Sequence, residues 1–187
     1  MVHNLVLFAH ILGAFGLIAA YTIEAIGLRG LRGATRRDEA LLWLRISRGI
    51  VMRLAPASLG VILIAGLYLM ATYGGPRGWI VVALASFVLL AAVGGVGTGL
   101  RMARIGPAVN RAADPLPDEL RTALRDRVLL LSLDVRLAMA VGILFLMTLK
   151  PSALTSVAVI VLAIAVGLVA GLLPARENRN AFRTAAG

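Results

Sequence analysis

The chain has 187 residues, of which 60% are hydrophobic and 15% charged, and its formal net charge at pH 7 is +10. Soluble domains are about 45–50% apolar even when glycine is counted, so this composition excludes an ordinary soluble domain. The positive charges flank apolar runs instead of coating one face, so no nucleic-acid partner is expected. The chain contains no cysteine, which excludes disulfides, thiolate metal sites and cysteine nucleophiles.

Five apolar windows are long enough to cross a bilayer, for which about 20 residues are needed. They predict an all-α integral membrane bundle of five transmembrane helices, with residues 1–187 forming a single transmembrane domain. The first window has no basic segment before it, so it is expected to be retained and not cleaved as a signal peptide. The five windows are residues 5–28, 50–73, 79–100, 128–149 and 153–173.

Arginine alternates with these windows along the chain. Of the 19 Lys and Arg residues, 16 fall in three zones, Arg29 to Arg53, Arg101 to Arg127 and Arg176 to Arg183. Cytoplasmic connections carry an excess of Lys and Arg. The pattern therefore predicts a multi-pass protein of the cell (cytoplasmic) membrane, with the N-terminus outside, the C-terminus inside, and anionic lipids at the cytoplasmic face as partners.

The connections have features of their own. Residues 74–78 and 150–152 are short turns, which predicts that spans two and three, and spans four and five, form antiparallel hairpins. Residues 38–45 mix apolar and charged side chains at helical spacing, so we expect an interfacial cytoplasmic helix before span two. Asp118 and Glu119 suit a helix N-terminus, so span four is expected to begin as a cytoplasmic helix there.

Two pairs of glycines are spaced four residues apart within the predicted spans. Gly95 and Gly99 lie in span three, and Gly167 and Gly171 in span five. Small residues at this spacing let helices approach closely. They predict either packing within the chain or a homodimer interface through one of the pairs.

Four ionisable residues within the spans form a predicted polar cluster. Glu24, Arg53, Asp134 and Arg136 all fall in the cytoplasmic half of the bundle when the spans are oriented by the arginines. Asp134 and Arg136 are two apart and do not face each other, so each is expected to pair across helices, with Arg136 or Arg53 bound to Glu24. The cluster is either a structural clamp or a site for a substrate, a proton or a cofactor carboxylate.

His10 lies in the outer half of span one, where no acidic residue accompanies it. A neutral imidazole in the bilayer needs a hydrogen-bond partner, a metal or a haem iron. One histidine does not build a zinc site, so no metal site is predicted, and the choice between a packed histidine and a haem ligand stays open.

Several short segments together resemble a known group of membrane proteins. They are residues 7–14, which open span one, an arginine at the start of span two, a tryptophan opening span three, and residues 146–151, which end span four. The chain resembles the small integral membrane proteins of unknown function related to copper resistance protein D, a superfamily that includes the HemJ-type protoporphyrinogen oxidases. The resemblance implies that His10 and Lys150 form a functional pair with haem b, and Arg53 and Arg136 would then bind its propionates.

Three functions follow from these observations. The first is a haem- or porphyrin-binding membrane protein. The second is a small transporter or permeation subunit that uses the Glu24, Arg53, Asp134 and Arg136 cluster. The third is a non-catalytic membrane scaffold.

Overall fold

The computed structural model describes residues 1–72 and 75–173, so the third arginine zone, Arg176 to Arg183, lies outside the described residues. Within the described ranges the chain is helical and contains no strand. The elements are α1 (Val2–Gly33), α2 (Arg37–Thr72), α3 (Gly78–Val93), the π-helical segment η1 (Gly94–Gly99), α4 (Leu100–Arg111), α5 (Asp118–Leu124), α6 (Arg127–Leu149) and α7 (Ala153–Leu172).

Five helical stretches are long and apolar enough to cross a membrane. The third of them is the continuous run of α3, η1 and α4, from Gly78 to Arg111, and the fourth joins α5 to α6. The described part of each predicted window lies within one of these stretches, apart from single residues at an end. The all-α, multi-pass architecture predicted from the hydropathy pattern is therefore confirmed.

The arginine-rich connections differ from the prediction in detail. Residues 38–45 are not a separate helix but form the first turns of α2, which continues to Thr72. A helix does begin at Asp118, as predicted, but it ends at Leu124. Asp126 then caps α6, because its Oδ1 accepts a hydrogen bond from the Val128 N–H at 2.9 Å. A capping aspartate favours a new helix start, so α5 and α6 are two helices.

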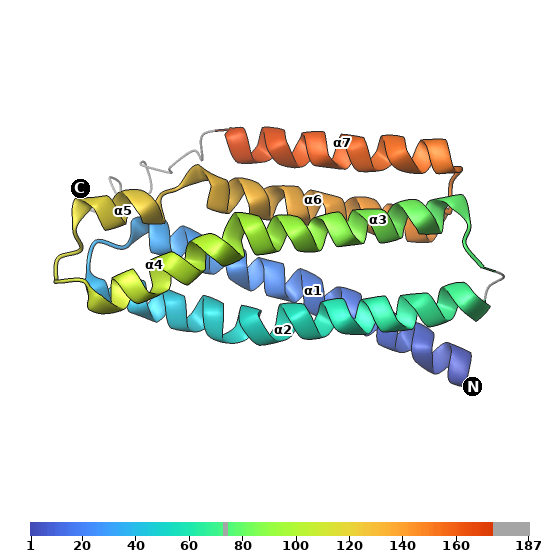
Figure 1. Ribbon diagram of the computed structural model, residues 1–187, viewed down its shortest axis with the longest axis horizontal. Coiled ribbons are helices and arrows are strands. Elements are labelled where there is room, and N and C mark those ends of the chain that lie inside the picture. Colours follow the sequence, from blue (N-terminus) through green and yellow to red (C-terminus); the bar gives the residue numbers. More distant parts are fainter. Residues whose placement is uncertain (73–74, 174–187) are drawn as a thin grey trace, which may run out of the picture.

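Helix α6 is the centre of the bundle, and it packs against α1, α3, η1 and α7. Figure 1 shows α1 and α2 running side by side below it, with α7 above. The α6–α7 hairpin is packed as predicted. Helices α2 and α3 are antiparallel, but α3 packs on α6 and α7 instead of on α2. The reason is that its buried residues Ala83, Ser86 and Leu90 face that side.

The two ends of the bundle differ in charge. The end of α1, the start of α2, the end of α4 and all of α5 gather at one end, called here the arginine-rich end (Figure 1). The N-terminus, the end of α2 and the connection between α6 and α7 lie at the opposite end. Arg125 Nε donates to the carbonyl of Arg32, and the Leu116 N–H donates to the carbonyl of Thr35. These bonds tie the two long connections together.

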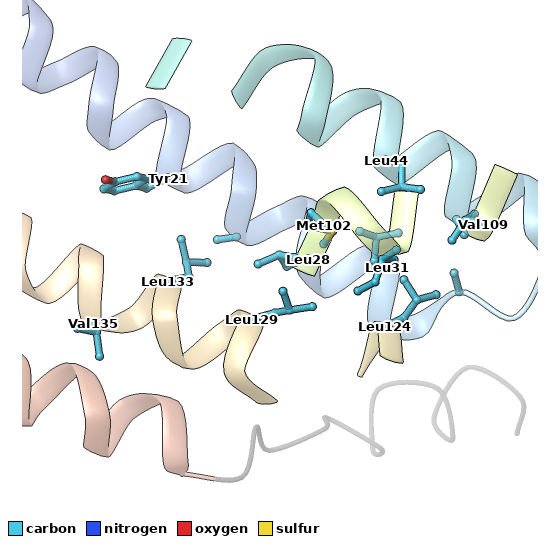
Figure 2. Packing of buried hydrophobic residues seen from close by; sticks show 14 of the residues in the cluster. Tyr21, Leu28, Leu31, Leu44, Met102, Val109, Leu124, Leu129, Leu133 and Val135 are labelled. Atoms are coloured by element: carbon cyan, nitrogen blue, oxygen red, sulfur yellow. The ribbon is translucent and has the colours of Figure 1, made fainter. Parts of the chain in front are cut away.

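The main hydrophobic core lies in the half of the bundle near the arginine-rich end. Figure 2 shows its side chains from α1, α2, α4, α5 and α6 meeting between the helices, among them Leu31, Leu44, Val109, Leu124 and Leu129. A smaller cluster of Ala83, Leu146 and Ile160 joins α3, α6 and α7. Many large apolar side chains elsewhere on the helices are exposed, as expected where lipid is the solvent.

Helices α6 and α7 approach closely at glycines. A Cβ at Gly167 would lie 2.6 Å from Val135 Cα, and one at Gly171 would lie 2.9 Å from Leu131 Cα. Backbone at that distance leaves no room for a methyl group. Gly167 and Gly171 therefore serve packing within the chain, the first of the two roles predicted for the glycine pairs.

Candidate functional site

Two opposite charges are buried together inside the bundle. Glu24 of α1 is 6% exposed and Arg136 of α6 is 4% exposed. Arg136 Nη2 lies 2.7 Å from Glu24 Oε1, and Nη1 lies 3.0 Å from Oε2. This two-point geometry matches the planar guanidinium to the planar carboxylate and makes the pair strong and directional. We call Glu24 and Arg136 the buried ion pair.

Two further N–H donors of Arg136 are also used. Its Nε donates to the carbonyl of Ser132 at 3.1 Å, and Nη2 donates to Thr98 Oγ1 at 3.0 Å. The ring of Tyr21 lies below the guanidinium, with its centroid 4.8 Å from Cζ, a cation–π contact. Tyr21 and Glu24 are three residues apart, so both project from one face of α1. The charge is thus held by three segments, α1, η1 and α6.

The π-helical segment makes room for the guanidinium. Four of its six residues are glycine. A Cβ at Gly94 would lie 3.1 Å from Arg136 Cδ, and one at Gly97 would lie 2.5 Å from Ser132 Cβ. The wider π turn brings Gly94, Gly97 and Thr98 toward α6, whereas a Cβ at Gly95 would meet nothing within 4 Å. Single π turns inside α-helices are frequent at functional sites.

Polar groups continue from the ion pair to the arginine-rich end. Thr98 Oγ1 and Ser132 Oγ lie 2.8 Å apart. One turn further along, Arg101 Nη1 donates to the carbonyls of Val96 and Gly97. Arg101 Nε pairs with Asp126 Oδ2 at 3.0 Å, where both side chains are about one-third exposed. We call this set the polar series: Glu24, Arg136, Thr98, Ser132, Arg101 and Asp126.

Toward the opposite end the surroundings change from polar to apolar. In that direction Met139 of α6 lies about one turn from Arg136, Leu90 of α3 one turn from Gly94, and Leu17 of α1 two turns from Glu24. All three are buried and belong to the main core. This apolar layer bounds the polar series on one side, so the series extends only toward the arginine-rich end.

The structure brings together two of the four residues predicted as a polar cluster. Glu24 and Arg136 pair, but Arg53 is exposed on α2. Asp134 points toward α7, where a Cβ at Gly171 would lie 3.3 Å from its Oδ2. The physical reason is helical geometry, because Asp134 lies two residues before Arg136 and therefore on a different face of α6.

His10 lies away from the ion pair. Its Nδ1 is 3.0 Å from the carbonyl oxygen of Ile62, and a Cβ at Gly66 would lie 3.2 Å from its Cε1. His10 and Glu24 are fourteen residues apart on α1, about 21 Å along the axis. That is farther than a propionate of a His10-bound haem reaches. The predicted haem residues His10 and Arg136 therefore do not share one site.

Lys150, the predicted partner of His10, has a clear structural role. It ends α6 in the left-handed conformation, with φ of 48°, and its N–H donates to the carbonyl of Leu146 at 3.0 Å. Few residues other than glycine and asparagine adopt this conformation readily. Pro151 follows, and Ser152 then caps α7 by accepting from the Thr155 N–H.

The sequence did not predict Arg101 and Asp126 of the polar series or, beside the ion pair, three hydroxyl residues: Tyr21, Thr98 and Ser132. All three could not be recognised as site residues, because hydroxyl residues are common within apolar spans and carry no charge. Spacing was the available signal, since Tyr21 precedes Glu24 by three residues and Ser132 precedes Arg136 by four. Neighbours at these distances share a helix face.

The glycines of η1 provide a matched pair of substitutions. Gly97→Ala should lower the free energy of unfolding by about 1–3 kcal/mol, because its Cβ would overlap Ser132. Gly95→Ala should be neutral or stabilising by up to about 1 kcal/mol, because alanine is the better helix former and the space is open. Thermal unfolding of the detergent-purified proteins measures both. Equal loss in the two variants would contradict the packing described here.

Comparison of the chain with protein-family models, with curated proteins and with solved structures finds no match in any of the three. The function is therefore argued from the geometry of this chain alone.

Proposed function

We propose that the protein is a small membrane transport protein whose polar series is the permeation path, with the buried ion pair as its gate. The observation that carries the proposal is the position of the pair: two opposite charges, 6% and 4% exposed, inside helices apolar enough to span a membrane, connected by polar groups to one end. Ionisable residues within spans are costly and by default mark a path or a site.

The lining of the series suits a proton or a small inorganic ion. It consists of two hydroxyl groups, two backbone carbonyls and two arginine–carboxylate pairs. Hydroxyl groups both donate and accept, so Thr98, which accepts from Arg136, can donate to Ser132, whose hydroxyl donates in turn to the carbonyl of Leu129. Arg101 and Asp126 are partly exposed and form the entrance.

The ion pair closes this path by satisfying both charges at once. While Glu24 holds Nη1 and Nη2 of Arg136, each charge is neutralised by the other and attracts an entering ion only weakly. Neutralising Glu24 removes the charge–charge attraction and leaves Arg136 bonded to Thr98 and Ser132. The guanidinium then becomes available next to the apolar layer of Leu17, Leu90 and Met139, which is the last barrier to the opposite end.

A flux assay tests the gate. The purified protein is reconstituted into liposomes, and proton and chloride entry are followed with internal dyes. Glu24→Gln should raise the flux at least about tenfold, the effect of removing about 1.4 kcal/mol from a barrier. Thr98→Val, which keeps the shape but removes the hydroxyl, should lower it. Asp118→Asn, at an exposed ion pair outside the polar series, is the control and should leave it unchanged.

Folding has to be checked in the same experiment, because leaving one buried charge without its partner costs about 3–5 kcal/mol. Size-exclusion chromatography and circular dichroism establish which variants are folded. If wild type and a folded Glu24→Gln variant both match protein-free liposomes, the ion pair is a structural clamp and the transport proposal fails. Thr98→Val gives an independent answer if Glu24→Gln does not fold.

We further propose that the arginine-rich end faces the cytoplasm, with the N-terminus outside, in the cell membrane. The excess of arginine in the two long connections supports this orientation, and residues 38–45 would then lie at the cytoplasmic interface. A reporter enzyme that is active only in the cytoplasm, fused after the last residue, should be active. Activity of an exported reporter at the same position, with none from the cytoplasmic one, would reverse the orientation.

Haem binding at His10 is a second candidate, favoured by the orientation of its ring. A carbonyl oxygen only accepts, so the contact with Ile62 places the proton on Nδ1 and the lone pair on Nε2. Metal-binding histidines usually donate their other ring N–H in this way. When bound, haem would supply one-electron chemistry; His10 would hold the iron, and Arg136 would take no part.

An absorption spectrum tests this candidate. Haem added to the detergent-purified protein should give a Soret band in the wild type and in His3→Ala, the control at the other histidine. The band should weaken or shift in His10→Ala. Identical spectra in all three proteins, or no band in any, would exclude His10 as a ligand.

A further inference from the structure

An open groove lies between α2 and α4 at the arginine-rich end, separate from the polar series. Its volume is about 440 Å³. Arg45 and Arg48 of α2 line one side, Pro107 and Asn110 of α4 line the other, and Leu41 and Leu44 are the large apolar residues. The lining contains two arginines and no acidic residue.

Arg48 is fixed in the groove by α4. Its Nη1 donates to the carbonyl of Met102, and a Cβ at Gly106 would lie 2.7 Å from that nitrogen. Because Gly106 has no side chain, the Arg48 guanidinium has room to lie against α4. Among the described residues this is the single hydrogen bond of Arg48, so most of its five N–H donors remain for another acceptor.

Four acidic residues at this end are engaged elsewhere. Asp114 contacts Arg36 and the N–H of Arg37, Asp118 pairs with Arg121, and Asp126 pairs with Arg101. The Glu39 carboxylate accepts from the N–H of Thr35. Within the described part of the chain, neither Arg45 nor Arg48 has a carboxylate within 4 Å. The groove therefore carries uncompensated positive charge.

The depth of the groove matches the lipid headgroup layer. Span two is predicted to begin at Ile50, so Arg48 and Arg45 lie about 3 and 8 Å outside it. The headgroup layer on each side of a bilayer is about 5–8 Å thick. One turn beyond Arg48, toward the span, the exposed apolar side chain of Met52 lies on the same face of α2. It lies where an acyl chain of a bound lipid would run.

We propose that this groove binds the headgroup of an anionic glycerophospholipid, with Arg45 and Arg48 contacting its phosphodiester. Arginine matches phosphate oxygens in two-point geometry, and basic pockets between membrane helices bind anionic headgroups. Arg37 adds a third positive charge beside the groove, because its Nη2 donates to the carbonyl of Asn110 at 2.8 Å. The proposal depends on the membrane-spanning fold and is independent of the transport path.

Lipid retention by the detergent-purified protein, followed by native mass spectrometry, tests this site. Phosphatidylglycerol and phosphatidylcholine with the same acyl chains are the probes. Wild type should retain phosphatidylglycerol about tenfold better. Arg45→Gln should reduce that retention about fivefold, the contribution of one arginine beside an anionic headgroup. Arg104→Gln, at an exposed arginine of α4 outside the groove, is the matched control and should retain the wild-type preference.

The other outcomes overturn the proposal. Equal retention of the two lipids, or a folded Arg45→Gln variant that behaves as the control, would show that no headgroup site exists here. Displacement of phosphatidylglycerol by an equal concentration of glycerol phosphate would assign the groove to a soluble phosphate compound. Arg45→Gln is the decisive variant because Arg45 makes no hydrogen bond within the described residues. Substitution of Arg48 would also remove its hydrogen bond to the carbonyl of Met102.

Discussion

The rest of the bundle is organised around one constraint, a positive charge on α6 that has to be neutralised within apolar surroundings. Glu24 supplies the opposite charge from α1, and Thr98 supplies a hydroxyl from η1. Gly94 of η1, the π turn and the position of Tyr21 all follow from fitting a guanidinium between three segments. Because a buried pair is costly to break from either side, it also fixes the register of α1 against α6.

The ion pair lies where the two parts of the bundle meet. Helices α1 and α2 form one part, and α3, α6 and α7 form the other. They join near the arginine-rich end, through the main core and the bonds between the two long connections. Carboxylates at that end are used in caps and partly exposed pairs, which contribute little individually. The charge left over is positive, and in the groove between α2 and α4 it is available to the membrane.

Much of the fold could be predicted because hydropathy and arginine placement report directly on membrane insertion. The five spans fall into this class. An arginine partner for Glu24 was also expected, but the sequence left Arg53 and Arg136 as alternatives, and the structure shows that it is Arg136. The separation of α2 from α3 could not be predicted. A short turn makes two helices antiparallel, but it does not determine whether they pack against each other. Asp134 and Arg53 were grouped with the ion pair only because they lie at a similar depth in the predicted spans. Which side chains pair also depends on the helix face from which each one projects. The role of Thr98 could not be predicted from the sequence, because its inward position depends on the π turn.

The separation of the two charges along the chain has a consequence for biosynthesis. Glu24 and Arg136 are 112 residues apart, and ribosomes add about 5–20 residues per second. The carboxyl group of α1 therefore exists for roughly 6–22 s before its guanidinium has been synthesised. During that interval the cations nearest to it along the chain are Arg29 and Arg32, which follow it in sequence. The fourth span to emerge thus supplies the charge that sets the final depth of the first.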